Sequence, residues 1–215
     1  MVQLNYYNME IIFSIIILIF SIVIHEFSHG AMANYLGDPT AKHAGRLTLN
    51  PLKHLDPIGS VIIPIFLILT TGKGFGFAKP VPINPYNFRD RKYGSLKTSL
   101  AGPGANLIIA LIFGLLLRFS LYYNFIPENI FPLFSFIVFI NMILAIFNLI
   151  PIPPLDGSHV LFAFLPYSME KLKIFLSQFG FYILIFLIFF FPSFFSILTY
   201  IINPIFFLIV GVPLR

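Results

Sequence analysis

The sequence contains no cysteine and few charged residues. Without cysteine there can be no disulfide bonds and no thiolate metal ligands, so any bound metal must be held by His, Asp, Glu or Asn. Charged residues make up 10% of the chain, hydrophobic residues make up 58%, and the mean hydropathy is +0.93. A soluble domain carries about 25% charge. The composition therefore predicts an all-α polytopic membrane protein and argues against a water-soluble domain.

Several other features are also missing. The first apolar run has neither a basic n-region nor a small-residue cleavage site, so we expect no cleavable signal peptide. No internal repeat and no soluble second domain are evident. We expect residues 1–215 to form a single membrane-embedded domain, with a core at about 9–166 and accessory helices at about 172–212. The net charge of +5 is modest and does not indicate nucleic-acid binding.

Long apolar runs predict five membrane-spanning helices. The segment 58–69 is also apolar, but it has only about twelve residues and contains Pro64, which suits a re-entrant or interfacial element. If it crossed fully, the count would be six. Two stretches, Ala44–Leu49 and Phe75–Val81, predict a small membrane-associated β element whose edge could hold an extended peptide. The expected spans are 9–35, 96–117, 131–149, 172–191 and 194–212, with a short helix at 158–166.

Basic residues indicate how the chain is oriented in the cell membrane. Nine of them follow the first span, from Lys42 to Lys97 at the start of the second, and a re-entrant 58–69 would place all nine on one face. Lys171, Lys173 and Arg215 are expected on this face too, whereas Glu10, Arg118 and Glu128 fall on the opposite one. By the positive-inside rule, the basic face is cytoplasmic and the N-terminus is outside.

The pattern His25-Glu26-Phe27-Ser28-His29 interrupts the first apolar run. Histidines four apart share one helix face and can bind the same metal ion. A carboxylate inside a membrane helix costs about 2.5 kcal/mol or more, which favours a functional role for Glu26. With nitrogen and oxygen donors only, the pattern suits zinc, one ion per chain.

A catalytic zinc needs a third protein ligand and an open position. Asp156 is the best candidate, because it stands in a proline-broken segment within apolar sequence, on the face that His29 approaches. His159 is the second choice. The remaining candidate ligands fit other roles, because they lie in turns or loops or on the opposite face of the membrane. They are Asp38, Asp56, His43, His54 and Glu128.

Glu26 is then the expected general base. Two amides on apolar helices, Asn148 and Asn106, could bond the substrate backbone or a developing oxyanion. Either amide could instead tie two helices together by a hydrogen bond. Asn148 is the stronger catalytic candidate of the two.

Taken together, these segments resemble the site-2 protease family of intramembrane zinc metalloproteases, in its compact subgroup without a PDZ domain. The resemblance rests on the His25–His29 motif, on Ala101-Gly102-Pro103, and on Asn148-Leu149-Ile150-Pro151 leading to Leu155-Asp156-Gly157. It implies a zinc held by His25, His29 and Asp156, with Glu26 as acid and base. It also implies cleavage of membrane-embedded helices that enter from the lipid, near the cytoplasmic side, as in regulated intramembrane proteolysis.

Two other functions compete with this one. A membrane metal-ion transporter or metal sensor could use the same His/His/Asp site, although the sequence has no chain of further acids across the bilayer and no inverted repeat. A catalytically silent binding homologue is the other alternative, and the intact ligand set argues against it. The sequence indicates neither the substrate's identity nor an oligomeric state.

Overall fold

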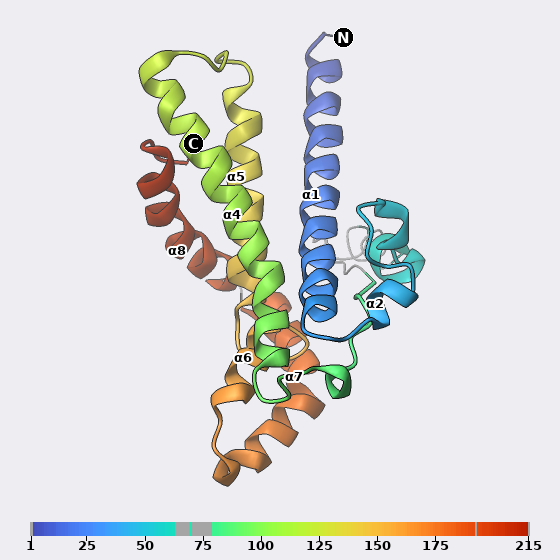
Figure 1. The fold of residues 1–215 in the computed structure, drawn as a ribbon. Helices are drawn as coiled ribbons and strands as arrows, with labels where there is room; N and C mark the ends of the chain where they lie inside the picture. The colour runs from blue at the N-terminus through green and yellow to red at the C-terminus, as the bar shows by residue number, and fades with distance from the viewer. Residues whose placement is uncertain (1, 63–68, 70–78, 192, 215) are drawn as a thin grey trace.

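The computed structural model describes residues 2–62, 69, 79–191 and 193–214, and within these residues the regular structure is helical (Figure 1). Short 3-10 turns occur at Pro51–Lys53, Pro85–Asn87 and Tyr167–Met169, and Pro57–Ile62 is a π-helix. The α-helices are α1 (Val2–Tyr35), α2 (Thr40–His43), α4 (Gly94–Tyr123), α5 (Phe131–Asn148), α6 (Asp156–Phe164), α7 (Glu170–Phe190) and α8 (Ser193–Val210).

Among the described residues, five helical segments are long and apolar enough to cross a membrane. Large apolar side chains stay exposed along them, such as Ile12 on α1 and Ile112 on α4, as expected of surfaces that face lipid. The prediction of an all-helical, multi-pass membrane protein is confirmed. The five segments are Ile11–Tyr35, Gly94–Tyr123, Phe131–Asn148, Tyr167–Phe190 and Ser193–Val210.

Helix α4 packs against both α1 and α5 and runs opposite to them (Figure 1). The chain between α1 and α4 leaves and returns at the same end of α1, because the Arg89 N–H donates to Leu36 O at 2.9 Å. Both ends of this segment therefore lie at the same end of α1, and the predicted re-entrant element itself is not supported by the described residues. Consequently α5 ends at the same end of the molecule as α1, and this brings α6 beside the histidines of α1.

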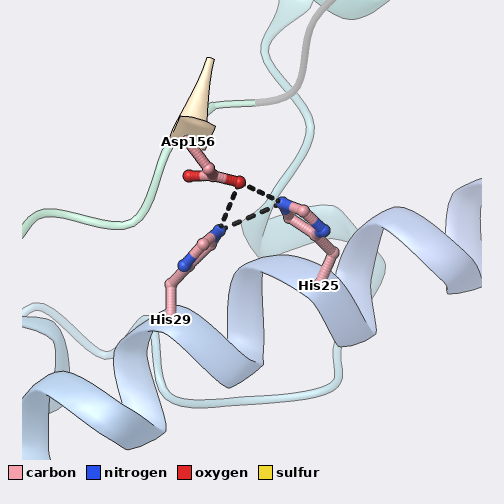
Figure 2. Close-up of side chains that lie close together, drawn as sticks. All are labelled: His25, His29 and Asp156. Atoms are coloured by element: carbon pink, nitrogen blue, oxygen red, sulfur yellow. Dashed lines mark hydrogen bonds and ion pairs between the residues drawn. The ribbon is translucent and has the colours of Figure 1, made fainter. Parts of the chain in front are cut away.

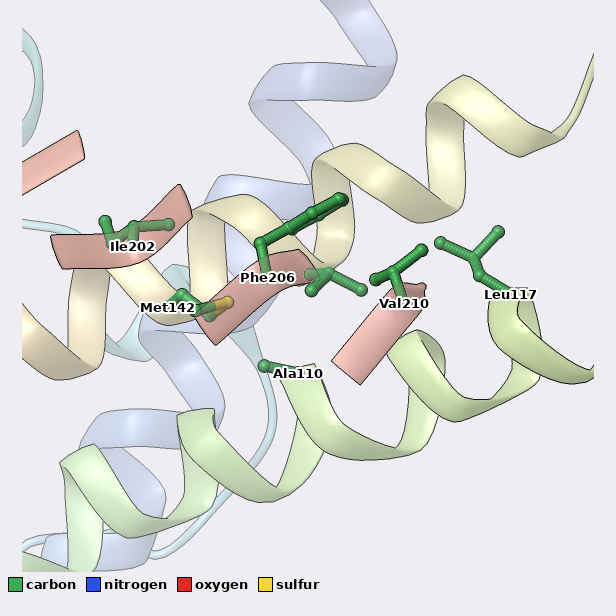
Figure 3. Close-up of a cluster of buried hydrophobic side chains, with 7 residues drawn as sticks. Ala110, Leu117, Met142, Ile202, Phe206 and Val210 are labelled. Carbon is green, nitrogen blue, oxygen red and sulfur yellow. The ribbon is translucent and has the colours of Figure 1, made fainter. Parts of the chain in front are cut away.

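The main core lies between α4, α5 and α8 (Figure 3). Its buried residues are Ala110, Leu117, Val138, Met142, Ile202, Phe206 and Val210. Since apolar burial drives little association within lipid, close packing and small residues must hold this interface together. Gly114 provides one such contact, because a Cβ there would collide with Ile209.

Helices α7 and α8 follow one another in the same direction (Figure 1). Leu184 and Ile188 of α7 pack on Leu155, at the end of the bundle where α6 lies. The far end of α8 reaches Arg118, whose Nη1 donates to Leu208 O at 2.5 Å. The sequence predicted two further spans here and did not indicate that they run in tandem. Arg215, which was expected on the basic face, lies outside the described residues.

The predicted β element is absent where the structure describes it. Ala44–Leu49 forms a turn and a bend, and residues 79–84 have no regular structure, while 75–78 lie outside the described residues. The strand predicted from the alternating pattern is wrong, because the Thr48 carbonyl accepts from a side chain and not from a neighbouring strand. The donor is His54 Nε2, at 2.8 Å. Of the predicted re-entrant segment, residues 63–68 lie outside the described part, and the portion before them belongs to the π-helix.

Asp38 joins the end of α1 to the segment that precedes α4. Its side chain is fully buried and accepts from the Thr40 hydroxyl, from the Asn84 N–H at 2.7 Å and from Asn87 Nδ2 at 2.8 Å. Burial alone would raise the pKa of Asp38, but these hydrogen bonds outweigh it and hold the pKa below its ordinary value of 3.8.

Because Asp38 accepts several hydrogen bonds as an anion, Asp38→Asn should destabilise the fold by roughly 2 kcal/mol or more. A lowered pKa means that this stabilisation is present above pH 3.8 and is lost as the pH falls further. Thermal unfolding in detergent should therefore show a gap between wild type and variant that narrows in acid. Asp90→Asn, at a half-exposed turn, should lower the Tm less. An equal effect of both substitutions would contradict this account of Asp38.

Candidate metal centre

Helix α1 presents His25 and His29 on one face, one turn apart (Figure 2). Their Nε2 atoms are 3.0 Å apart, and their rings lie edge to face with centroids 4.6 Å apart. Each residue is 6% exposed. Two buried imidazoles whose unprotonated Nε2 atoms face each other are stabilised by a group that accepts an electron pair from both nitrogens, such as a metal ion.

Asp156, the first residue of α6, approaches the same point (Figure 2). Its Oδ2 is 3.1 Å from His25 Nε2 and 3.2 Å from His29 Nε2. Within the part of the chain that the structure describes, these three residues form the one His/Asp/Glu group close enough to share a metal ion. The structure thus brings together the three predicted ligands; their binding of a metal remains a prediction.

Hydrogen bonds to the other ring nitrogens fix the imidazole tautomers. His25 Nδ1 lies 2.6 Å from Asn106 Oδ1, and His29 Nδ1 lies 2.7 Å from Thr98 O. Both partners are acceptors, so each Nδ1 carries the proton and each neutral ring keeps its lone pair on Nε2. With both rings neutral, two lone pairs and a carboxylate oxygen face one another, and they repel unless a cation lies between them. This donor set fits a divalent metal, with each histidine oriented as metal-bound histidines are.

The amide of Asn106 belongs to a buried polar network that joins three helices. Its Nδ2 donates to Ser21 O of α1 at 3.2 Å and to Asn141 Oδ1 of α5 at 2.7 Å, which leaves Oδ1 to accept from His25. Asn141 Nδ2 donates in turn to Ser21 Oγ at 3.0 Å. The sequence analysis missed Ser21, Asn141 and the carbonyl of Thr98. An amide on an apolar helix was the available signal for Asn141, as it was for Asn106.

The Ala101-Gly102-Pro103 run shapes α4 where it meets the histidines. A Cβ at Gly102 would collide with both imidazoles, so only glycine lets α4 approach α1 this closely. Pro103 has no N–H to donate to Ser99 O, which weakens the helix in the turn where Thr98 O accepts from His29. Gly102 therefore provides the space for the two imidazoles, and Thr98, in the preceding turn of α4, provides the acceptor for His29.

The proline-rich segment before α6 positions Asp156. Leu155 is buried against α7, and the Pro153–Pro154 peptide bond is cis. A Cβ at Gly157 would collide with the backbone of Leu149 and Ile150, so α6 packs directly on the end of α5. Within this part of the chain Leu155 and Gly157 are buried, whereas Pro151 and Pro154 are exposed.

Glu26 lies beside the cluster but bonds elsewhere. Its Oε2 accepts from the Val81 N–H at 2.9 Å, a contact between residues far apart in the sequence. Asn148, the other predicted catalytic residue, donates from Nδ2 to Leu144 O of its own helix at 2.8 Å. The amide that contacts a predicted ligand is therefore Asn106, and the proposed roles of Glu26 and Asn148 remain predictions.

The other candidate ligands lie outside the three-residue group. Asp38 binds loop amides, and His54 bonds Thr48 O. Asp56 accepts from the Gly59 N–H. His159, the second choice for the third ligand, is exposed on α6. Glu128 precedes α5, at the end of the bundle away from the cluster, and His43 is exposed at the end of α2.

Gly102→Ala should abolish metal binding, because its methyl group would occupy the space that the two imidazoles fill. Gly104→Ala is the matched control, since a Cβ there meets nothing within 4 Å on the same helix. Metal content of the purified variants, measured by mass spectrometry, should be near zero for the first and at the wild-type level for the second. Full metal content in Gly102→Ala would show that the site lies elsewhere.

Asn106→Leu should weaken metal affinity by about 10- to 100-fold, because His25 Nδ1 loses its acceptor and its fixed tautomer. Asn148→Leu removes an amide that, among the described residues, bonds within its own helix, and it should leave metal affinity within about threefold of wild type. Competition with a chelator of known affinity measures both. Equal affinities for the two variants would contradict the orienting role of Asn106.

Comparison with known proteins agrees with this geometry. The model of Peptidase family M50 matches residues 123–191, which include Asp156. The chain is 36% identical over 191 residues to "Putative zinc metalloprotease YwhC" of Bacillus subtilis, covering 86% of this chain and 83% of that protein. It is 33% identical over 175 residues to "Putative zinc metalloprotease Rip2" of Mycolicibacterium smegmatis, covering 78% of this chain and 63% of that protein. No solved structure matches the chain. With these relatives and this arrangement of helices, the chain belongs to peptidase family M50, the site-2 protease family.

Proposed function

We propose that this protein is an intramembrane zinc metalloprotease that hydrolyses peptide bonds in or near the transmembrane segments of other membrane proteins. The observation that carries the proposal is the convergence of His25 Nε2, His29 Nε2 and Asp156 Oδ2 within 3.2 Å of one another, in a multi-pass membrane protein of this family. The two relatives described above are themselves named as zinc metalloproteases, which supports zinc as the metal.

One zinc ion per chain would be held by His25, His29 and Asp156. When bound, zinc supplies a Lewis acid that polarises the scissile carbonyl and makes a water molecule more acidic. Three protein ligands leave a fourth position open, as catalytic zinc sites require. Asn106 and the Thr98 carbonyl keep the two imidazoles oriented toward the ion.

Glu26 acts as the general base and then as the general acid. It takes a proton from the attacking water and delivers it to the leaving amine. Its place next to His25 on α1 keeps the carboxylate beside the ligands. Asn148 uses one N–H for Leu144 O, and among the described residues its side chain has no other hydrogen-bond partner. Its second N–H can therefore donate to the developing oxyanion, and its carbonyl oxygen can accept from the substrate backbone.

The active site is proposed to lie toward the cytoplasmic side. His25 is ten residues from the end of α1 at Tyr35, about 15 Å along the helix. The segment that joins α1 to α4 at that end carries most of the basic residues of the chain. A site at this depth within apolar helices is reached most directly by a substrate helix that enters from the lipid.

Glu26→Gln tests the assignment, because the amide cannot accept the proton while the metal ligands stay in place. The variant should retain zinc at the wild-type level and lose at least about 100-fold in cleavage of a membrane-helix substrate in detergent. Glu170→Gln, at the exposed start of α7, is the matched control and should cleave at the wild-type rate.

Two results would overturn the proposal. Cleavage by Glu26→Gln at the wild-type rate would show that Glu26 is not the general base. Zinc flux into liposomes that persists in Glu26→Gln, with no proteolysis by wild type, would favour a metal transporter that uses the same three ligands.

A further inference from the structure

We propose that the backbone amide of Val81 is a positioning group for Glu26: it holds one carboxylate oxygen and leaves the other directed to the reacting water. The inference rests on the proposed protease function and deepens it. Its basis is the hydrogen bond from Val81 N–H to Glu26 Oε2, at 2.9 Å, between α1 and a segment 55 residues further along the chain.

The local sequence makes Val81 the one available donor at this point. Pro80 and Pro82 flank it, and proline has no N–H. A residue that precedes a proline is restricted to extended backbone, and both Lys79 and Val81 precede one. Pro80-Val81-Pro82 is therefore a stiff, extended stretch that presents a single N–H.

The side of this stretch nearer the N-terminus is fixed by the loop after α2. The Lys79 N–H donates to His54 O at 3.0 Å, and Arg46 Nη2 donates to Lys79 O at 2.7 Å. Arg46 and His54 are themselves buried, at 8% and 1% exposure. This loop holds Lys79 in place, two residues before the amide that bonds Glu26.

The other side is fixed to the end of α1. The Asn84 N–H donates to the buried carboxylate of Asp38 at 2.7 Å, and the Arg89 N–H donates to Leu36 O at 2.9 Å. Val81 itself is 6% exposed. It passes Gly30, one turn after Glu26, where a Cβ would lie 3.1 Å from Val81 Cγ1.

The hydrogen bonds on both sides of Val81 indicate that this segment positions Glu26 and does not block it. A segment that covered Glu26 and had to leave before each turnover would be weakly held, because the hydrogen bonds on both sides would break every time. Here the stretch is tied to buried groups before and after Val81. Its amide is therefore a permanent neighbour of Glu26, and it restricts the carboxylate to the orientation in which proton transfer is efficient.

The first experiment removes the N–H and measures kcat and KM separately on the full-length protein. Val81→Pro, and a backbone ester at Val81 that replaces N–H by oxygen, should each lower kcat about 10- to 100-fold with KM within about twofold. Val81→Ala keeps the N–H and should restore most of kcat. A backbone ester at Ile83 is the matched control, and zinc content should stay at the wild-type level throughout.

A second experiment uses NMR to detect the hydrogen bond between Val81 N–H and Glu26 independently of proteolytic activity. Pro-Val occurs once in the sequence, so labelling proline with ¹³C at its carbonyl and valine with ¹⁵N gives a single amide signal, that of Val81. A hydrogen bond to a carboxylate moves an amide proton downfield. Glu26→Ala should move this signal upfield and speed its hydrogen exchange at least tenfold, whereas Glu170→Ala should leave it in place.

The outcomes separate this inference from the proposed function. Loss of kcat in both N–H-free variants, together with the upfield shift in Glu26→Ala, supports positioning. Unchanged or raised kcat in the Val81 ester overturns it, and a raised kcat would mean that the segment blocks the site. If Glu26→Ala leaves the chemical shift and the exchange rate of the Val81 amide unchanged, the Val81–Glu26 hydrogen bond itself is refuted. Absence of proteolysis in wild type, with the upfield shift still observed, would instead refute the protease function.

Discussion

Three electron-pair donors lie within 3.2 Å of one another in a membrane protein, and the structure around them keeps them in that position. Two neutral imidazoles and a carboxylate gain nothing from such proximity unless a cation lies between them. Three features hold them together without one. Asn106 and Thr98 accept from the outer ring nitrogens, and Gly102 leaves space for both rings. Groups outside the three-residue cluster therefore fix the arrangement that the proposed metal site requires.

In the segment between α1 and α4, irregular backbone lies beside a membrane helix, and its N–H and C=O groups need hydrogen-bond partners. Backbone polar groups without partners are costly there, and the described part of this segment has only short helical elements to satisfy them. Buried side chains supply the partners. Asp38 accepts loop N–H groups, Arg46 donates to the Lys79 carbonyl, and His54 donates to the Thr48 carbonyl. The side chains of Asp38 and Arg46 also hold the extended stretch that reaches Glu26, so the stability of this loop and the geometry at Glu26 depend on one another.

Much of the site could be predicted from the sequence, because its main determinants are local or topological. The spacing of His25 and His29 defines a shared helix face, and the charge distribution placed Asp156 at their end of the bundle. The choice between Asn106 and Asn148 was harder, because it depends on how each helix is rotated. A signal was present: Gly102, Asn106, Ala110 and Gly114 form a stripe with a period of four, the pattern of a closely packed membrane helix, and all four are buried.

The errors have physical causes as well. Alternation of polar and apolar residues at 44–49 indicates a strand only when another strand supplies the hydrogen bonds, and here His54 supplies one from a side chain. The contact of Val81 with Glu26 joins distant residues through the path of an irregular loop, which no periodicity encodes. The tandem course of α7 and α8 depends on which faces meet Leu155 and Leu117, and uniformly apolar helices do not reveal that.

The polar network behind His25 links the candidate site to the assembly of the bundle. Apolar contacts alone would allow helices in lipid to rotate against one another, since lipid chains solvate an apolar face as well as a neighbouring helix does. The chain of hydrogen bonds from His25 through Asn106 and Asn141 to Ser21 has only one arrangement in which all partners are satisfied. That arrangement fixes the rotation of α1, α4 and α5 together. The orientation of the His25 imidazole and the packing of three membrane helices are thus set by the same hydrogen bonds, and a change at Asn141, which contacts neither His25 nor His29, would be transmitted to His25.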